Sequence, residues 1–515
     1  MILPQALGLA LLLTAVGCGG AGEARAGRRA GSAVWVDPRE AALAPEDWRV
    51  LAAAGVEEAF LEAGSLGWEG GRPAIAEAGA AWVGAVPPGT PVTLVVRGAG
   101  APAGAEADGR AAPELARALR ALRIRAEAGG LLPVGYHLDP STEPSPELVR
   151  ALRAAVGPGL LVSAGLPRER LRAAGARELA AAADFVVAFV YGQLPQAPDD
   201  PEAWNPARAL DDLAALEALD ADYLVGVTVV GSAHRLSPSG ERRESTTRTG
   251  LKALAQEPAL RLSIGDPLQG GVGRVVHSFQ AQRPVRAAGW QLAPGETVRV
   301  VRTAPSLVQA LLGELGQVDR GRRRGELFYR ASGPEEELSL SSAELAAALG
   351  EEPAAPELWP RLVVASIRGD AIELRLGLAN RSRQSTDLAA TDGNYLRVRT
   401  EGAHFVRVEP GEFTRYTLWR GGREVRPGLA GWREPDEVRL YTPMVRGGER
   451  IGGAVLELRR REPRPSVWVS GRYFLPDGRE LELDAVGGVI SGPGVLGPDG
   501  ERAGEGRPGD ERNAQ

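Results

Sequence analysis

Short apolar segments alternate with alanine- and arginine-rich helical stretches from Ala33 to Ser332, and this alternation limits the possible folds more than any other feature. Apolar strands separated by helices are typical of a parallel α/β architecture, because parallel strands need a long crossover connection. The pattern predicts eight strands: Ala33–Asp37, Val56–Gly64, Pro91–Gly98, Leu131–Asp139, Leu160–Gly165, Asp184–Gly192, Tyr223–Gly231 and Gly325–Ser332. Eight is the number that a (β/α)8 barrel needs. The sequence therefore predicts a TIM-like barrel over residues 33–332.

An open, doubly wound sheet is the alternative arrangement of the same elements. Such sheets often carry a Gly-rich phosphate-binding turn after the first strand, and no such turn follows Asp37. The barrel is therefore favoured. Around the Pro294-Gly295 turn, apolar and polar residues alternate, which predicts a β insertion at about 273–302 within the barrel segment.

The pattern changes after the barrel segment. A short helix and the linker EEPAAPE are expected over residues 333–357. Beyond them, segments such as IELRLGLAN and VLELRRR alternate with period two, and FLPDGRELEL contains an Asp-Gly hairpin turn. These features predict an all-β sandwich over residues 358–485. Residues 486–515 are rich in glycine, proline and charge, so we expect a disordered tail there.

The N-terminus carries a short apolar run, ILPQALGLALLLTAV, followed by GCGG. The run is too short to span a bilayer, which takes roughly 20 apolar residues, and its position is typical of a secretory signal. We therefore expect a signal peptide over residues 1–17 and a flexible tether over residues 18–32. The segment AVGC resembles a bacterial lipobox, which implies lipidation of Cys18 and a place in the bacterial cell envelope, at the outer membrane where the cell has one. The alternative is an uncleaved signal anchor, or a buried apolar N-terminus with an incidental cysteine.

Composition limits the chemistry of the remaining chain. Cys18 is the only cysteine, which excludes internal disulfides and a cysteine nucleophile or cysteine metal site elsewhere. The formal net charge of −6 over 515 residues is mild, so nucleic acid is not an expected partner. The histidine spacing predicts no metal site, and no motif predicts a cofactor.

Candidate site residues follow from strand position, because barrel enzymes place their chemistry at the carboxyl ends of the strands. Three carboxylates pass this test: Asp37, Glu62 and Asp139. The fourth predicted strand ends in GYHLDPSTE, which adds His137 and Glu143 close to Asp139.

Further candidates are residues near other strand ends or in the loops that follow them. The sixth predicted strand ends at Tyr191, with Gln193 just beyond, and the aromatic rings of Trp35 and Trp204 lie near strand ends or following loops. Aromatic rings there either contact a ligand or pack in the core. In the sandwich, two uses are open for the aromatic side chains: a carbohydrate-binding face or packing in the core. These residues are Tyr416, Trp419, Trp432, Tyr441 and Trp468.

The segments GYHLD, LLVSAGLPRERL and DFVVAFVYG resemble an uncharacterised bacterial family, the domain of unknown function numbered 3142, whose members are thought to be glycosidase-like barrels. The strand ends are also distantly similar to glycoside hydrolase family eighteen, in which an acidic cluster closes the fourth strand and Met-x-Tyr-Asp closes the sixth. This resemblance implies that Asp139 or Glu143 matches the acidic cluster and that Tyr191 matches the tyrosine. In this chain His137 occupies one acidic position, and Gly192 replaces the aspartate.

The resemblance implies a protein that hydrolyses or binds a polysaccharide or another glycan. Glycoside cleavage ordinarily uses one protonated and one ionised carboxylate. If Asp139 is the proton donor, burial or the charge of Glu143 has to raise its pKa. Alternatively, Asp139 caps a helix or pairs with an arginine, and the chain is a non-catalytic glycan-binding or envelope scaffold protein.

Overall fold

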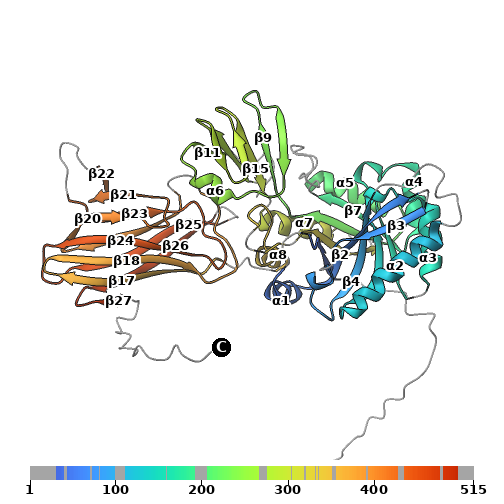
Figure 1. Ribbon diagram of the computed structural model, residues 1–515, viewed down its shortest axis with the longest axis horizontal. Coiled ribbons are helices and arrows are strands. Elements are labelled where there is room, and N and C mark those ends of the chain that lie inside the picture. Colours follow the sequence, from blue (N-terminus) through green and yellow to red (C-terminus); the bar gives the residue numbers. More distant parts are fainter. Residues whose placement is uncertain are drawn as a thin grey trace, which may run out of the picture.

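The computed structural model describes residues 31–39, 43–69, 72–79, 82–98, 111–157, 159–191, 206–265, 275–302, 304–317, 321–330, 332–333, 336–350, 355–389, 393–426, 434–475 and 479–496. Figure 1 shows a sandwich at one end of the molecule, a barrel at the other, and an antiparallel sheet above the junction between them. No helix in the described ranges has the length and apolar character needed to cross a membrane.

The eight expected strands form a closed parallel barrel, which confirms the predicted fold class. Their order is β1, β2, β4, β5, β6, β7, β8 and β16, and the barrel closes because β1 pairs with both β2 and β16. The strands are β1 (Ser32–Val36), β2 (Val56–Glu69), β4 (Pro91–Gly98), β5 (Leu132–Leu138), β6 (Leu161–Gly165), β7 (Phe185–Tyr191), β8 (Tyr223–Thr228) and β16 (Arg323–Tyr329). A further strand, β3 (Arg72–Glu77), pairs antiparallel with the end of β2.

Helices cover the outside of the barrel and connect its strands. They are α1 (Pro45–Ala53), η1 (Trp82–Ala85), α2 (Ala111–Ala128), η2 (Pro140–Thr142), α3 (Pro146–Val156), η3 (Arg168–Arg170), α4 (Ala174–Ala182), α5 (Pro206–Glu217), α7 (Pro305–Gln317) and α8 (Ser342–Leu349), where η marks a 3-10 helix. The start of α3 shows how the sequence sets a boundary. Ser145 accepts a hydrogen bond from the Leu148 amide at 3.1 Å, and Pro146 occupies the first helical position.

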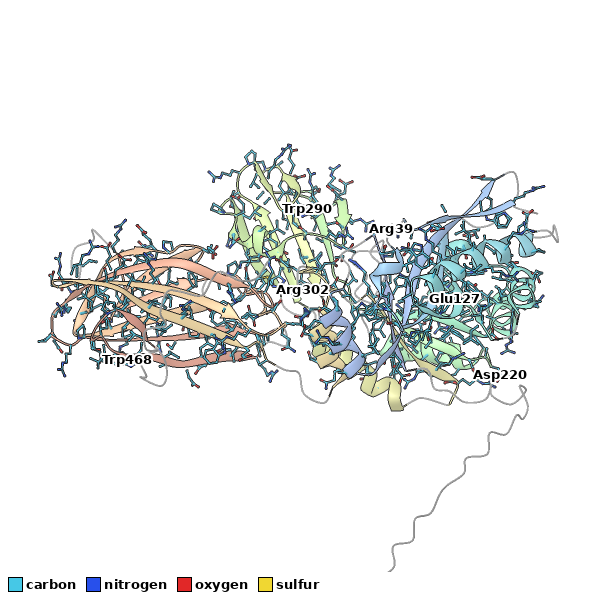
Figure 2. All side chains as sticks on the ribbon, turned by 60° about the horizontal axis from the view of Figure 1, so that its bottom comes forward. Arg39, Glu127, Asp220, Trp290, Arg302 and Trp468 are labelled. Carbon is cyan, nitrogen blue, oxygen red and sulfur yellow. The ribbon has the colours of Figure 1, made fainter. Side chains whose placement is uncertain are left out.

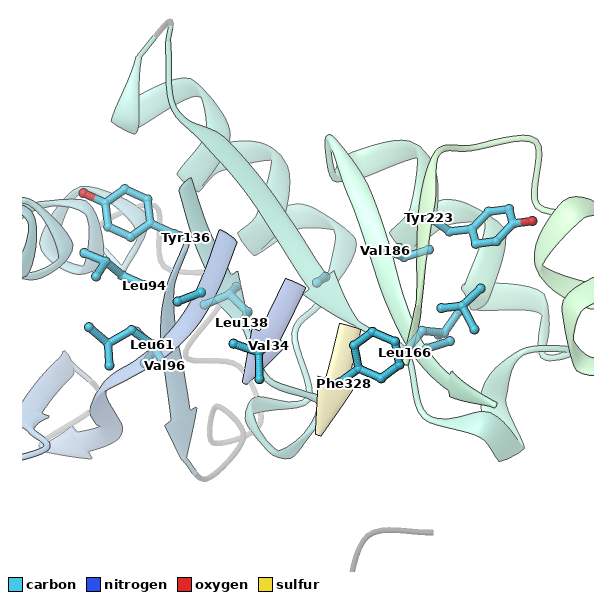
Figure 3. Close-up of a cluster of buried hydrophobic side chains, with 14 of the residues drawn as sticks. Val34, Leu61, Leu94, Val96, Tyr136, Leu138, Leu166, Val186, Tyr223 and Phe328 are labelled. Atoms are coloured by element: carbon cyan, nitrogen blue, oxygen red, sulfur yellow. The ribbon is translucent and has the colours of Figure 1, made fainter. Parts of the chain in front are cut away.

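Alternation along the strands divides the apolar side chains between two cores. Residues such as Val34, Leu61 and Phe328 point outward and pack against the helices, as Figure 3 shows. The intervening residues, among them Trp35 and Phe60, point inward and fill the barrel. The barrel is therefore a packed core, and a ligand has to bind at one of its ends.

The antiparallel insertion is larger than the sequence pattern predicts. Its five-stranded sheet has the order β10-β9-β15-β12-β11 and begins at Ser232, whereas the β insertion was expected at about 273–302. The strands are β9 (Ser232–Leu236), β10 (Arg242–Thr246), β11 (Leu260–Gly265), β12 (Val275–Ala281) and β15 (Thr297–Arg302), with a hairpin of β13 (Val285–Ala287) and β14 (Trp290–Leu292) and the helix α6 (Leu251–Gln256). The β10 segment, RREST, contains no apolar residue, so hydrophobic alternation cannot reveal it.

The C-terminal part is the expected all-β sandwich. Its sheets have the orders β20-β24-β18-β17-β27 and β22-β21-β23-β19-β25-β26, and Leu374 and Val469 are among the side chains of the shared core. The strands are β17 (Leu358–Arg368), β18 (Ala371–Asn380), β19 (Tyr395–Glu401), β20 (Ala403–Glu409), β21 (Arg415–Arg420), β22 (Arg423–Val425), β23 (Glu437–Tyr441), β24 (Arg450–Arg460), β25 (Ser466–Phe474), β26 (Glu480–Val489) and β27 (Gly494–Leu496).

The start of the expected disordered tail, 486–515, is strand instead. β26 continues to Val489, and β27 pairs with β17 through Val495 and Val363. The three-residue strand GVL is too short to give a hydrophobic pattern, so only its pairing reveals it. Residues from 497 onward lie outside the described residues.

Buried side chains join the insertion to the sandwich. Leu388 and Met444 of the sandwich belong to the apolar core of the insertion. Arg302 at the end of β15 lies 3.4 Å from Asp387, and Figure 2 places Arg302 where the parts of the molecule meet. Lys252 of α6 also forms an ion pair with Glu449. The sandwich therefore packs directly on the insertion that follows β8.

Candidate functional site

Five charged side chains gather at the carboxyl ends of neighbouring barrel strands. Asp37 and Arg39 follow β1, Glu62 lies in β2, Arg97 lies near the end of β4, and Asp139 follows β5. We call these residues the mouth cluster. The three carboxylates were expected at this end of the barrel, and the structure brings them together through two arginines that the sequence had not singled out.

Arg39 holds Asp37 and Glu62. Its Nε and Nη2 donate to the two oxygens of Asp37 at 3.0 and 2.9 Å, and its Nη2 also donates to Glu62 Oε1. Burial raises the pKa of Asp37, but the hydrogen bonds and charge of Arg39 outweigh it and lower the pKa overall. Asp37 is therefore held ionised. Half of the Arg39 side chain is exposed, at 50%, so Arg39 presents the cluster to solvent, and Figure 2 shows it at the end of the barrel.

Arg97 links Glu62 to Asp139. Its Nη1 lies 3.2 Å from Glu62 Oε2, and its Nε lies 3.9 Å from Asp139 Oδ2. The Glu62 side chain is only 1% exposed, and this burial, with the nearby charge of Asp37, raises its pKa against the opposing effect of both arginines. Glu62 therefore takes up a proton more readily than Asp37.

Asp139 caps the turn that follows β5. Its Oδ1 accepts hydrogen bonds from the Ser141 amide at 2.9 Å and the Ser141 hydroxyl at 2.5 Å. Glu143 ends this turn in a left-handed conformation, with φ of 43°, and its side chain is exposed. All of these contacts treat Asp139 as an acceptor. Asp139 therefore caps the short helix η2 and lies near Arg97, as in the alternative interpretation of this residue. Glu143 is exposed and is not buried beside Asp139.

His137 and Trp35 lie beneath the mouth cluster, inside the barrel. His137 is fully buried, its Nδ1 lies 3.0 Å from Ser163 Oγ, and burial lowers its pKa to about 4. Trp35 is 1% exposed and meets His137 edge to face, with ring centroids 5.8 Å apart. Both residues were expected to line a ligand site. The structure places them in the layer that supports the mouth cluster from below.

Tyr329 of β16 belongs to the same layer of buried side chains as Trp35 and His137. Its ring packs on Trp35 at a centroid distance of 5.6 Å, and burial raises the pKa of its hydroxyl. The charge of Arg97 opposes this rise, while Asp37 and the other two carboxylates add to it. Tyr329 therefore sits within electrostatic reach of the whole cluster, although no sequence motif marked it.

The remaining expected site residues are placed only in part. Tyr191 ends β7 and pairs with Val227 of β8, but its side chain lies outside the described part of the chain. Gln193, Trp204 and Cys18 also lie outside it.

Gly165 is a site residue that sequence reasoning missed. It ends β6, and a Cβ at this position would lie 2.1 Å from Pro140 Cδ and 2.6 Å from Pro140 N. Only glycine therefore lets the turn after Asp139 pack on β6. The described residues contain no group of three His, Cys, Asp or Glu side chains that could hold a metal ion.

No family model matches this chain, and no curated protein matches it. A solved chitinase from Chromobacterium violaceum has 13% identity to it, covering 62% of this chain and 98% of that chain, with a TM-score of 0.39. The spore cortex-lytic enzyme SleL of Bacillus cereus has 14% identity, covering 62% and 73%, with a TM-score of 0.42. The chitinase ChiB of Flavobacterium johnsoniae has 10% identity, covering 63% and 94%, with a TM-score of 0.35. Likeness this low establishes no activity, and membership in the domain of unknown function numbered 3142 stays a prediction.

Proposed function

We propose that the barrel mouth binds a glycan of the cell envelope or its surroundings. The mouth cluster carries the proposal, because ligands of (β/α)8 barrels bind at the carboxyl ends of the strands. The side chains of Arg39 and Arg97 are 50% and 29% exposed, whereas the side chain of each acidic residue of the cluster is at most 8% exposed. Guanidinium N–H groups donate to sugar hydroxyl or carboxylate oxygens, and the carboxylates behind them fix their orientation.

Hydrolysis of that glycan is the second candidate, and the raised pKa of Glu62 favours it. Glycosidases place their two carboxylates roughly 5–9.5 Å apart. Glu62 and Asp139 lie 3.2 and 3.9 Å from nitrogens of the same Arg97 guanidinium, so the two carboxylates are neighbours at the barrel mouth. In this reaction Glu62 donates a proton to the glycosidic oxygen, and Asp139 serves as base or nucleophile. In this candidate reaction Glu62 is the proton donor, because burial raises its pKa.

A glycan array followed by a hydrolysis screen tests both candidates on the full chain. We expect Arg39→Gln to weaken glycan binding by about tenfold or more, because a charge-assisted hydrogen bond is lost. Glu127→Gln is the matched control for Glu62→Gln, since Glu127 lies on the barrel surface and pairs only with Arg123 in α2 among the described contacts (Figure 2). If the glycan is also cleaved, Glu62→Gln should lower turnover by roughly 10²–10⁴ while Glu127→Gln leaves it unchanged. Glycan binding that is indifferent to Arg39→Gln and Glu62→Gln would place the ligand elsewhere.

The proposal includes attachment to the cell envelope through a lipid on Cys18. A lipid anchor needs more than one acyl chain, because each buried methylene contributes only about 0.8 kcal/mol and single acylation is reversible. A diacylglyceryl group with an N-acyl chain on one cysteine meets this need. Such an anchor would hold the barrel at a membrane surface, where envelope glycans are concentrated.

A further inference from the structure

A pocket of about 750 Å³ opens on the outer face of the sandwich. It lies near the junction with the insertion, because Glu449, next to the lining residue Arg450, pairs with Lys252 of α6. It lies over β17, β18 and β24, with β27 along one side. Trp359 pairs with Ala379, and Ala379 pairs with Arg450, so one row of outward side chains crosses three strands. In the next row Arg361 faces Gly377, which has no side chain and leaves the floor of the pocket open.

Trp359 is an exposed aromatic ring that the protein nevertheless holds in place. Arg381 lies over the ring, with its guanidinium carbon 4.2 Å from the centroid, and the indole N–H donates to Glu357 Oε1 at 2.9 Å. The residue remains 41% exposed, and Val495 beside it is 49% exposed. A fixed aromatic surface open to solvent loses little conformational entropy when a ligand packs on it.

Three arginines line the pocket that holds this ring, whereas Glu357 is the one carboxylate that bonds to the ring among the described residues. Arg361, Arg381 and Arg450 line the pocket and are exposed. Within the described ranges, none of them forms an ion pair with a carboxylate, in contrast to the paired arginines of the mouth cluster. The pocket is therefore cationic around an apolar platform, and its volume falls within the range of about 300–1,000 Å³ that small-molecule sites occupy.

We propose that this pocket binds an acidic saccharide. The sugar ring packs on Trp359 and Val495, and its carboxylate accepts hydrogen bonds from the arginines, which suit the planar geometry of that group. Charge complementarity selects an acidic sugar over a neutral one, and the platform selects a sugar over a bare anion. The site is separate from the mouth cluster and does not depend on the function proposed for the barrel.

Titration calorimetry on the full chain tests the proposal with a short oligogalacturonate and with its methyl ester, in which methylation removes the carboxylate charges. We expect the acidic probe to bind at least about tenfold more tightly than the ester. Trp359→Ala and Arg450→Gln should each weaken binding of the acidic probe by about tenfold or more. Arg459→Gln is the matched control, because Arg459 lies on the same strand and is 60% exposed but pairs with Asp370 away from the pocket. Glu62→Gln should also leave this binding unchanged, which separates the pocket from the mouth cluster.

Three results would overturn the proposal. Equal affinity for the acid and the ester would remove the role of charge. Binding that survives both Trp359→Ala and Arg450→Gln would locate the probe outside the pocket. Displacement of the probe by an equal concentration of inorganic phosphate would show a site for the anion alone.

Discussion

The Arg97 guanidinium lies between Glu62 and Asp139, with its Nη1 3.2 Å from Glu62 Oε2. It is the link between strands β2, β4 and β5 at the mouth of the barrel, because its Nε also faces Asp139 at 3.9 Å. Glu62 is almost wholly buried and depends on Arg97 and Arg39 for compensation of its charge. The protonation of the site therefore depends on Arg97.

Replacing Arg97 by methionine should destabilise the protein in a pH-dependent way. At pH 7 we expect Arg97→Met to lower the free energy of unfolding by about 2–3 kcal/mol, a value reduced by the partial solvent exposure of Arg97. The loss of the cation raises the pKa of Glu62 in the folded state further. This cost is absent at low pH, where Glu62 is protonated, and it grows as the pH rises, reaching its full size only above the raised pKa of Glu62 in the folded variant.

Urea unfolding at pH 7 and at pH 4.5 measures this difference. The double variant Arg97→Met, Glu62→Gln should recover much of the stability at pH 7, because it removes the uncompensated carboxylate as well. An Arg97→Met variant that loses the same free energy of unfolding at both pH values would contradict the charge argument.

Gly165→Ala should disturb the turn that holds Asp139. The new Cβ would overlap Pro140, including its backbone nitrogen, so the turn has to shift, at an expected cost of about 1–3 kcal/mol in the free energy of unfolding. Gly175→Ala is the matched control, because Gly175 lies in α4 and has nothing within 4 Å of an added Cβ. It should be neutral or stabilising by up to about 1 kcal/mol. Chemical denaturation of both variants checks this, and equal stability would mean that the turn accepts a methyl group.

The barrel was predictable because its strands are apolar on both faces. Inward and outward residues are both buried, so each strand is a continuous apolar run, as in FVVAFVY of β7. The insertion was predicted only in part, because β10 gives no apolar signal and gains its place by pairing with β9. Pairing depends on residues distant in the sequence, which a single local pattern does not contain.

The carboxylates of the mouth cluster were predictable from strand position, whereas their depth and partners were not. Trp35 and His137 precede Asp37 and Asp139 by two residues, so they point to the same side but lie one layer deeper, roughly 6.6 Å along the strand. The alternation of residues along a strand shows which way a side chain points, but it does not show how deep in the barrel the side chain lies. Arg97 was missed because this chain contains 60 lysines and arginines, and one more arginine at a strand end carries no distinguishing signal.

His137 should make the barrel sensitive to mild acid. Burial lowers its pKa to about 4 from the usual 6.5, so the folded state keeps it neutral while the unfolded chain protonates below 6.5. The resulting stability is fully present above pH 6.5 and is lost as the pH falls toward 4, by about 3 kcal/mol at most. His137→Gln, which does not titrate, should flatten the pH dependence of the free energy of unfolding in this window.

His277→Gln provides a parallel case in the insertion, where burial also lowers the pKa to about 4. The two variants are compared with the unmodified protein by urea unfolding at pH values from 4 to 7.5. A His137→Gln variant with an unchanged pH profile would mean that the folded protein already accommodates the charged imidazole.

Lipidation of Cys18 is expected to place the protein in the membrane fraction. Mass spectrometry of the mature N-terminus should find a cysteine that carries diacylglyceryl and acyl groups. Cys18→Ala should abolish this modification and shift the protein out of the membrane fraction. Cys18 is the only cysteine in the chain, so no other thiol can carry the lipid in its place. Recovery of Cys18→Ala in the membrane fraction, with its signal peptide processed normally, would contradict anchoring through a lipid on Cys18.

The junction between insertion and sandwich should resist separation because its charges are buried. The Lys252 side chain is 8% exposed and bonds to Glu449, while its backbone amide donates to Glu337 Oε2 at 2.9 Å. Glu337 also forms an ion pair with Arg446 of the sandwich, with its Oε1 2.7 Å from Arg446 Nε. Lys252→Glu places a third carboxylate in this group, and we expect it to lower the free energy of unfolding by about 3–5 kcal/mol or to detach the sandwich.

Small-angle X-ray scattering and urea unfolding together distinguish these two effects, since detachment increases the radius of gyration without unfolding either part. The charge swap Lys252→Glu, Glu449→Lys restores an opposite pair and should recover both the compact dimensions and most of the stability. Reversing an exposed pair by Arg459→Glu beside Asp370 is the control and should change the free energy of unfolding by less than about 1 kcal/mol. If Lys252→Glu behaves like this exposed control, the junction is held by apolar contacts around Leu388 and Met444 and not by its ion pairs.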